Sequence, residues 1–510
     1  MKSSTDLLDS FIQDEIALRR MNVFCLDRIS DFESQEKFGP EILKTLSSMI
    51  VELDEGIKEF SKEKQYHSLK MISNILARFH SCDDIYILLE QNDIATKIQE
   101  IVISFEFPGV MIQSARFLQM YSLGKKDYMK AVFDESFVDH LIDRIADPNG
   151  VYDYSLSMKS SMLGITKNDL AYLNGDVVYS VRDGFIAAIY NSYINDVISD
   201  DQFLKLIEVS VEMLRTLTNA NNIKTIIVII GLCIKKRIGA KDLQNTILNY
   251  IIMYSQCQKS IIQSTSLVIL TEILYSIKEV AEIFEDNNSL EQILQSSIIM
   301  EHIDIDGVET IRYHGDEFVL ESVCGFLRVL FCSNNPPLIY ISKKSIYWPA
   351  FFMAVGGSTQ VVKCKFLRTI RWIFASDLSL IHHFVECGVF ETLVFIMMNG
   401  SLEEQTTIFK CFDVSFSEFN HDMCKQIIEA GIINVISDII GCINNNQMAW
   451  MCHLIRQIIE FIELTSNPKY DCIIDSNEMQ MIIEELQCRN MPNEYSIIVG
   501  GINNVHNRNE

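Results

Sequence analysis

The chain has 510 residues, a formal net charge of −25, and only 8 Pro and 21 Gly, so long helices joined by short turns are expected rather than a loop-rich fold. The negative charge disfavours general attraction to nucleic acid or to anionic membrane surfaces, and we expect no nucleic-acid partner. The 14 Cys show no Cys-x-x-Cys pair and no framework spacing, which indicates reduced thiols.

The segments that could direct the chain to a membrane do not have the required pattern. The N-terminal residues carry charges where a secretory signal needs an apolar run. The apolar stretch from Ile226 to Ile234 is about half as long as a bilayer crossing requires. We therefore expect no membrane insertion and a location in the cytoplasm or the nucleus.

Residues 1–82 are expected to form amphipathic helices that cap the rest of the chain. Apolar residues recur at every third or fourth position from Ile42 to Leu53 and again from Leu69 to Phe79. The first 60 residues hold 13 acids and 7 bases, so this end presents a negative surface.

Residues 83–490 repeat a short joint, which consists of two apolar residues, a carboxylate, any residue, and then Gly, Asn or Ser before another apolar helix. The six joints end at Asn92, Ser136, Asn287, Gly388, Gly431 and Asn477. The three intervals between neighbouring joints are 44, 43 and 46 residues, which is the period of a stacked helical repeat. A Gly or Asn in the left-handed conformation would end one helix and allow a sharp bend into the next.

Two insertions and a tail interrupt this pattern. Gly, Asn and Asp cluster near 147–180 and near 301–316, and we expect loops or short irregular elements there. Residues 491–510 are polar and contain Gly500-Gly501 and several Asn, so we predict a disordered tail.

The segment from Ile427 to Ile459 resembles one armadillo repeat. Apolar residues and an acid precede Ala430-Gly431, and the last helix of the segment carries Ala449-Trp450. The segment from Phe384 to Phe416 fits the same frame. This resemblance to armadillo and HEAT-like proteins implies an all-α fold, a right-handed α-solenoid of stacked three-helix repeats. It also implies that the third helices line a concave groove that binds peptides or partner proteins.

The resemblance also suggests an aromatic column on the third helices. In nuclear import adaptors of this family, a third-helix Trp is followed four residues later by an Asn that clamps the bound peptide. The corresponding residues here are Phe117, Phe366, Phe409 and Trp450, and none has an Asn four residues later. A conventional nuclear import adaptor is therefore disfavoured. The column could line the groove or belong to the core, and the pattern leaves both interpretations open.

No catalytic or cofactor signature was found in its required context. The chain contains no phosphate-binding loop before Lys-Ser or Lys-Thr, no dinucleotide fingerprint, no nucleophile elbow and no His-Glu-x-x-His. The pairs His382-His383 and Cys452-His453 are adjacent residues, which point in different directions on a helix and form no metal site alone. We therefore expect no catalytic residues, no cofactor, no metal and no enzymatic activity.

The most informative functional feature is a stretch without acids, residues 322–376, which we call the basic island. It contains no Asp or Glu in 55 residues, although the chain average predicts about seven, and it contains seven bases. Such a patch can attract an anionic partner segment, and aromatic and Arg residues often dominate binding interfaces. The candidate partner-binding residues are Lys343, Lys344, Trp348, Lys365, Arg368, Arg371 and Trp372, together with Phe409 and Trp450 of the aromatic column.

A structural interpretation of the basic island stands beside this one. A buried stretch between repeats would also lack acids, and its bases could pair with Glu321, with Asp377 or with the acidic face of an adjacent repeat. The favoured function is a protein-protein interaction scaffold or adaptor that binds an acidic or phosphorylated segment of a protein partner. The alternative is a regulatory subunit of a kinase, phosphatase, chaperone or trafficking complex, or a divergent nuclear transport adaptor. The sequence does not indicate the oligomeric state.

Overall fold

The computed structural model describes most of the chain as helices. The described residues are 38–104, 108–146, 181–217, 220–286, 288–305, 308–332, 346–376, 379–415, 421–465, 467–489 and 491–509. The chain divides into two compact units, Met1–Ile251 and Ile252–Glu510, which are described separately. The expected insertion at 147–180 lies outside the described residues.

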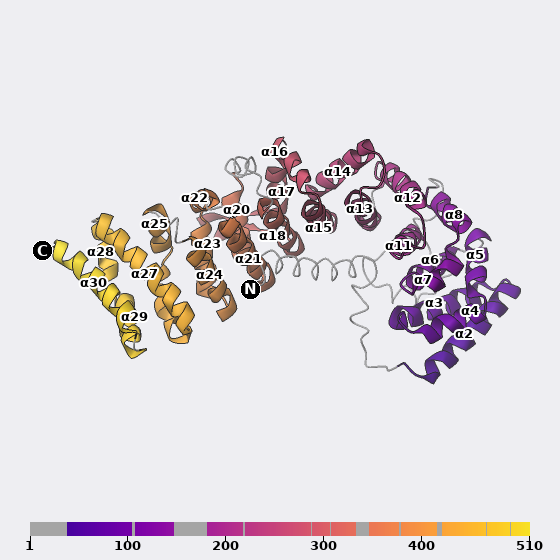
Figure 1. Ribbon diagram of the computed structural model, residues 1–510, viewed down its shortest axis with the longest axis horizontal. Helices are drawn as coiled ribbons and strands as arrows, with labels where there is room; N and C mark the ends of the chain where they lie inside the picture. The colour runs from indigo at the N-terminus through magenta and orange to yellow at the C-terminus, as the bar shows by residue number, and fades with distance from the viewer. Residues whose placement is uncertain are drawn as a thin grey trace. The chain divides into compact units, whose positions relative to one another are not determined.

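The first unit consists of helices throughout its described residues (Figure 1). They are α2 (Pro40–Lys58), α3 (Lys62–Phe79), α4 (Asp83–Gln91), α5 (Ile94–Ser104), α6 (Pro108–Tyr121), α7 (Lys126–Val132), α8 (Glu135–Ala146), α11 (Val181–Ile194), α12 (Asp200–Met213), α13 (Ala220–Lys235) and the start of α14 (Lys241–Ser255). The helices α3, α6, α11 and α13 pack against one another in that order. The apolar stretch of α13 is therefore a buried core helix, as Ile226, Ile229 and Ile230 are fully buried.

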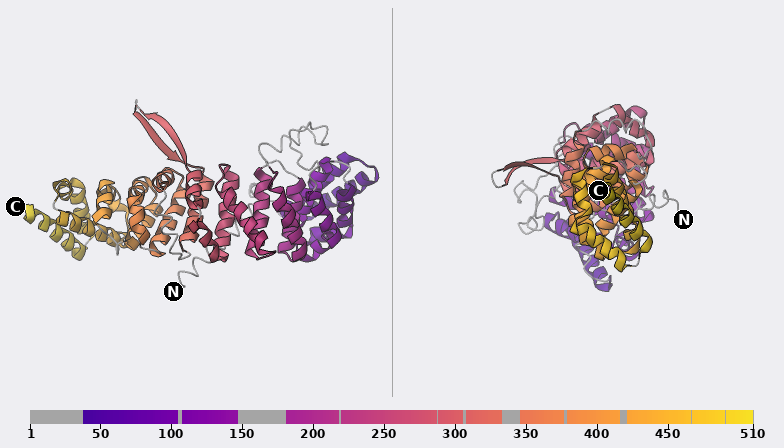
Figure 2. Two further views of the ribbon diagram at one scale, coloured as in Figure 1. Left: turned by 90° about the horizontal axis from the view of Figure 1, so that it is seen from above. Right: turned by 90° about the vertical axis from the view of Figure 1, so that its left-hand side faces the viewer.

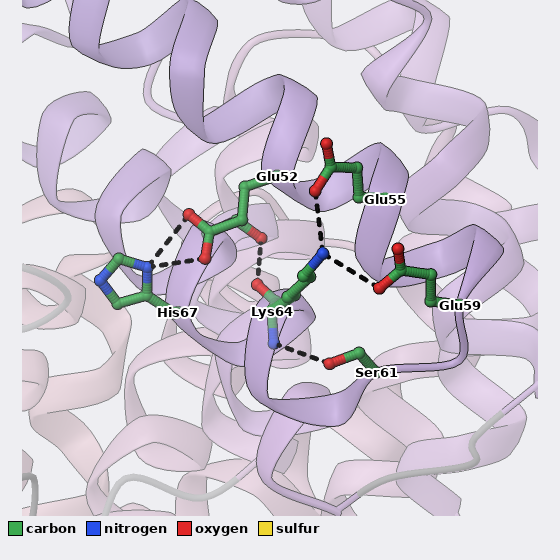
Figure 3. A network of polar contacts seen from close by, with 7 residues as sticks. Glu52, Glu55, Glu59, Ser61, Lys64 and His67 are labelled. Carbon is green, nitrogen blue, oxygen red and sulfur yellow. Dashed lines mark hydrogen bonds and ion pairs between the residues drawn. The ribbon is translucent and has the colours of Figure 1, made fainter.

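The antiparallel pair α2 and α3 begins the described part of the first unit, and polar side chains join the two helices (Figure 3). Lys64 Nζ lies 2.8 Å from Glu55 Oε2 and 3.0 Å from Glu59 Oε2, and His67 Nδ1 lies 3.2 Å from Glu52 Oε1. The Ser61 hydroxyl accepts a hydrogen bond from the Lys64 backbone N–H and so caps α3. The predicted apolar stripe forms the contact, since Leu46, Leu53 and Leu69 are fully buried.

The second unit continues with helices and contains the two strands of the described chain. The helices are α15 (Ser260–Ser276), α16 (Ile283–Asp286), α17 (Ser289–Ser297), α18 (Glu317–Cys332), α20 (Trp348–Gly356), α21 (Gln360–Ser376), α22 (Ser379–Glu386), α23 (Val389–Asn399), α24 (Leu402–Ser415), α25 (His421–Glu429), α26 (Ile432–Ile439), α27 (Asn445–Thr465), α28 (Pro468–Ile474), α29 (Asn477–Cys488) and α30 (Pro492–Asn509). Short 3₁₀ helices follow α15 (Lys278–Glu282) and α26 (Ile440–Cys442).

Helices of the second unit pack in rows, as the repeat period predicts. The first row, which we call the third helices, is α15, α18, α21, α24, α27 and α30, each in contact with the next. The second row, which we call the second helices, is α17, α20, α23, α26 and α29, again each in contact with the next. Hydrogen bonds between neighbouring repeats link residues about one period apart, such as Thr369 with Cys324 and Tyr470 with Glu429. The period that the joints predict is thus visible in the packing.

The joints at Gly388 and Gly431 adopt the predicted geometry. Their φ angles are 85° and 86°, in the left-handed region where a side chain with a Cβ is strained. The prediction is wrong at three other copies. At Asn92 the left-handed residue is the following one, Asp93, with a φ of 53°.

At the other two copies a side-chain cap replaces the left-handed residue. Ser136 lies inside α8, where Asp134 accepts a hydrogen bond from the Phe137 N–H, and Asn477 begins α29 after the capping residue Ser476. A polar side chain at the N-terminus satisfies the free backbone N–H groups, so no left-handed residue is needed. Asn287 lies outside the described residues.

The insertion at 301–316 is a β-hairpin rather than an irregular loop. Strands β1 (Ile299–Ile305) and β2 (Val308–His314) pair antiparallel, with Ile299 opposite His314 and Ile305 opposite Val308. Figure 2 shows the hairpin extending away from the helices of its unit. Asp306-Gly307, between two alternating segments, is a known two-residue hairpin signal, and the sequence interpretation overlooked it.

The predicted disordered tail is also wrong, because residues 492–509 form the helix α30. Ile498, Ile502 and Val505 recur at helical spacing and are buried against the neighbouring helices α27 and α29. Gly501 permits this contact, since a Cβ at that position would lie 2.8 Å from Ile459 Cγ2 of α27. The two Gly that suggested disorder are therefore part of a helix, and one of them serves close packing.

A buried Gln near the start of three helices fixes the turn before each of these helices. Gln65 of α3, Gln263 of α15 and Gln405 of α24 each donate from Nε2 to a backbone carbonyl eight or nine residues earlier. The acceptors are Gly56 at 3.0 Å, Ser255 at 3.2 Å and Met397 at 3.2 Å. Each bond ties the start of one helix to the end of the preceding helix, and the Gly56 carbonyl also accepts a hydrogen bond from the Ser61 backbone N–H.

Candidate partner-binding site

Part of the basic island belongs to an aromatic core of the second unit. Trp348 is 1% exposed, and its ring centroid lies 5.0 Å from that of Phe384 and 5.7 Å from that of Phe352. Six of the nine residues of α20 are buried. Much of the absence of acids in this stretch therefore follows from burial, since a carboxylate here would lose its hydration without a partner.

Arg328 of α18 is buried, and the other described bases of the island lie on α21, where Lys365 forms a structural pair. Lys365 Nζ lies 3.2 Å from Glu321 Oε1 of α18, and the two side chains are only 11% and 24% exposed. One turn later, the Thr369 hydroxyl donates to the Cys324 carbonyl of α18 at 3.0 Å. Lys365 thus holds neighbouring third helices together, which is the structural interpretation of the island.

Arg368 takes part in a more exposed contact with the next third helix. Its Nη2 lies 3.2 Å from Glu403 Oε1 of α24, and the side chains are 48% and 64% exposed. The Gln360 amide donates to the Ser401 hydroxyl at 3.2 Å across the same boundary. Exposed ion pairs of this kind contribute about 0–1 kcal/mol, so Arg368 can exchange Glu403 for another carboxylate at little cost.

Arg371 and Trp372 form the accessible part of the island. Arg371 is exposed, and no acidic side chain among the described residues forms an ion pair with it. Trp372 is half-buried beside it. Because Arg368 and Arg371 are three residues apart on α21, their side chains leave the helix on neighbouring positions of one face. We call Arg368, Arg371 and Trp372 the α21 face.

The remaining candidate residues divide between core and surface. Phe409 of α24 is fully buried, as are Phe117 and Phe366, so most of the aromatic column belongs to the core. Trp450 of α27 is half-buried and remains accessible. Trp348 and Phe409 cannot contact a partner from the core, which corrects their prediction as binding residues. Lys343 and Lys344 lie outside the described residues.

Cysteines near the α21 face are not set up as nucleophiles. Burial raises the pKa of the Cys324 thiol to about 12, although Lys365 opposes the shift. Burial likewise raises the pKa of Cys411 to about 12, with Arg371 opposing. Desolvation raises the pKa of Cys364 as well, helped by Glu404 and Glu403. These thiols stay protonated at neutral pH, and a protonated thiol is a poor nucleophile.

The described residues hold no group of three or more His, Cys, Asp or Glu side chains arranged to bind a metal ion. None of the described helices combines the length and the apolar character that a membrane crossing needs. Of the acids that pair with the island, Glu321 was named from the sequence as a possible partner of its bases, and Glu403 was not. The repeat period agrees with this pairing, because Glu321 precedes Lys365 by 44 residues.

Comparison with known proteins provides a likeness of fold. No protein-family model and no curated protein matches the sequence. Among solved structures, an engineered protein from the Northeast Structural Genomics Consortium is 13% identical, with 90% of this chain and 98% of that chain covered and a TM-score of 0.50. A second engineered protein from the same consortium is 15% identical over 50% of this chain and 97% of its own, with a TM-score of 0.36.

A third solved structure comes from work on a conserved phosphorylation switch that controls the interaction between cadherin and beta-catenin. It is 11% identical, with 94% of this chain and 87% of that chain covered and a TM-score of 0.39. At these identities, only the engineered protein with a TM-score of 0.50 bears on the fold, and its likeness extends over most of the chain. Together with the rows of third and second helices, it supports a helical repeat protein.

Proposed function

We propose that the chain is a non-enzymatic interaction scaffold of the armadillo-like kind, a right-handed solenoid that binds an acidic or phosphorylated segment of a protein partner at the α21 face. The observation that carries the proposal is the exposed Arg371, beside Arg368 and Trp372, in a chain of net charge −25. Because Arg371 is exposed and forms no ion pair among the described residues, its charge is available to a ligand, and an anionic segment would be steered to it.

The geometry also indicates how a partner would be held. Arg371 offers a planar fork of donors that matches a carboxylate or a phosphate. Arg368 lies within reach of Glu403 but is largely exposed, so it can turn to the same ligand. Trp372 adds an apolar surface beside the two charges, and Trp450 of α27 presents a second partly exposed ring in the same unit. Aromatic and Arg residues in combination are typical of binding hot spots.

The test is a charge reversal in the full-length chain. Arg371→Glu changes the α21 face while leaving the Arg368–Glu403 pair in place, and Arg368→Glu with Arg371→Glu reverses the face completely. Partners recovered by affinity purification from the source cell should be lost with the double variant and reduced with the single variant. The matched control is Lys278→Glu with Lys425→Glu, two exposed bases elsewhere in the second unit, which changes the net charge equally.

A direct titration complements this experiment. A fluorescent peptide of alternating Glu and phosphoserine should bind the wild-type chain more weakly as salt rises, because the contact is electrostatic. Binding by the control variant should equal that of the wild type. Partners and peptide affinity that are unchanged by the double variant would show that the α21 face is not the binding site.

A further inference from the structure

The second helices of the second unit carry charge of one sign. The helices α17, α20, α23, α26 and α29 contain six carboxylates and neither Lys nor Arg. The carboxylates are Glu291, Glu391, Asp438, Glu478, Glu484 and Glu485. Arg489, just after α29, is already bound to Glu485 and to the Ile440 and Ile443 carbonyls. This row therefore differs in sign from the basic α21 face.

An exposed apolar patch lies within this acidic row, on α20 and α23. Phe395 is 50% exposed, Met398 58% and Met353 52%. Phe395 rests on α20 at a residue without a side chain, since a Cβ on Gly356 would lie 3.5 Å from Phe395 Cδ1. Met353 precedes Gly356 by three residues and Met398 follows Phe395 by three, so both extend the patch along the same helix faces.

The charged residues on the helices of this patch and on the neighbouring α26 are all carboxylates. Glu391 stands one turn before Phe395 on α23 and is exposed. Asp438 is exposed on α26, which packs against α23. Neither α20 nor α23 supplies a base. Two Met and a Phe make an adaptable apolar surface, and a carboxylate rim around it selects against an acidic partner.

We propose that this patch, Met353, Phe395 and Met398 with the rim carboxylates Glu391 and Asp438, is a second binding site, which takes a basic amphipathic helix of a partner protein. Apolar residues of the helix at positions i, i+3 or i+4 and i+7 lie on Phe395 and the two Met side chains. Lys or Arg residues flanking that stripe face Glu391 and Asp438. The chain thus offers two sites of opposite charge preference, one on the third helices and one on the second helices.

The probe for this site is a synthetic 18-residue peptide with Leu along one helical face and Lys along its flanks. It is titrated against the full-length chain by fluorescence anisotropy, beside a scrambled peptide of equal composition and a version with Glu in place of Lys. The Lys peptide should bind at least about tenfold more tightly than either control. Phe395→Ser with Met398→Ser should weaken it about tenfold, because the apolar contact is lost.

Controls keep this result specific to the patch. Leu464→Ser removes an apolar side chain that is 70% exposed on α27 and should leave the affinity unchanged. Glu391→Gln with Asp438→Asn should weaken the Lys peptide and reduce the dependence of its affinity on salt. Circular dichroism confirms that each variant is folded, which is expected since every substituted side chain is exposed.

Three results would overturn the proposal. The first is unchanged binding by the Phe395 and Met398 double variant, and the second is binding of the Glu or scrambled peptide as tightly as the Lys peptide. The third is a dimer in sedimentation velocity that the double variant dissociates, because a second copy of the chain would then occupy the patch. The acidic peptide of the preceding section tests the α21 face separately, so either site can fail alone.

Discussion

Lys365 Nζ on α21 lies 3.2 Å from Glu321 Oε1 on α18, so two residues that are 44 positions apart in the chain join neighbouring third helices. The pair is weakly screened by solvent because both side chains are largely buried. By contrast, the pair formed by Arg368 and Glu403 is exposed. The basic island therefore combines a structural base and an accessible base that are three residues apart.

The first prediction concerns this difference. Lys365→Met should destabilise the α18–α21 contact by about 1–3 kcal/mol, because the Glu321 carboxylate loses its charged partner while remaining half-buried. Hydrogen exchange of peptides from α18 and α21 in the full-length chain measures the local loss. Adding Glu321→Met should recover part of it, since a buried pair can be replaced by apolar side chains.

Arg368→Met is the matched control for this prediction. It removes an exposed pair and should change the protection of α21 and α24 by less than about 1 kcal/mol. If Lys365→Met and Arg368→Met had equal effects, the assignment of Lys365 to the structure and Arg368 to the surface would be wrong.

The second prediction concerns the joint at Gly431. Gly431→Ala should destabilise the turn between α25 and α26 by about 1–2 kcal/mol, since its φ of 86° is in the left-handed region. No atom lies within 4 Å of the position that its Cβ would occupy, so the cost is conformational and not steric. Gly431→Asn should cost less, because Asn tolerates this conformation.

Gly441→Ala provides the comparison for Gly431. Its Cβ would also meet nothing within 4 Å, and its φ is not positive. The melting temperatures of the two variants should therefore differ, and only Gly431→Ala should melt at a lower temperature than the wild type. Equal melting temperatures would contradict the role of the left-handed turn.

The third prediction uses the two adjacent Gly of α30. Gly501→Ala should destabilise the docking of α30 by about 1–3 kcal/mol, because its Cβ would lie 2.8 Å from the branched Ile459 side chain. Gly500→Ala should stabilise α30 by up to about 1 kcal/mol, since open space surrounds the position and Ala favours a helix. Limited proteolysis at residues 492–509 reports both changes. Identical cleavage of the two variants would argue against a docked helix.

Periodicity predicted the helices and the repeat period well, because both depend on local apolar spacing. The intervals between joints predicted the repeat period, and contacts such as Thr369 with Cys324 link residues that are about one such period apart. The predicted turn geometry held at Gly388 and Gly431, where the residue type itself favours a left-handed φ. It did not hold at Ser136, where Asp134 caps the helix and the chain needs no left-handed residue.

The failures have physical causes that a single sequence does not display. Gly500-Gly501 looked like disorder, because the close approach of Ile459 that requires Gly501 is a tertiary contact. Trp348 looked like an interface residue, because the sequence does not show that its ring packs against Phe352 and against Phe384, which is 36 positions later. The patch at Phe395 was missed for a similar reason, since an exposed and a buried Phe on an apolar helix are distinguished only by packing.

The fourth prediction concerns two neighbouring carboxylates with opposite pKa shifts. Desolvation of the Glu391 carboxylate by the atoms around it, reinforced by the charge of Glu429, raises the pKa of Glu391 above its ordinary value. A hydrogen bond from Lys469 holds the pKa of Glu429 below its ordinary value, although slight desolvation of this exposed carboxylate opposes the shift. The folded chain therefore binds a proton at Glu391 more tightly, and at Glu429 less tightly, than the unfolded chain.

The sign of each pH dependence follows from these directions. Because the folded pKa of Glu391 is raised, its ionisation lowers stability as pH rises through that value, and Glu391→Gln should raise the melting temperature at pH 8. The gain should fade as pH falls toward about 4, where the unfolded carboxyl also becomes protonated. Glu429→Gln should behave oppositely, with a lower melting temperature at pH 8 and a loss that fades in acid. Melting curves of both variants from pH 8 to about pH 3 measure this, because the loss for Glu429→Gln fades only as pH falls through the lowered folded pKa of Glu429. If both variants changed the melting temperature in the same direction at pH 8, the opposite pKa shifts assigned to Glu391 and Glu429 would be wrong.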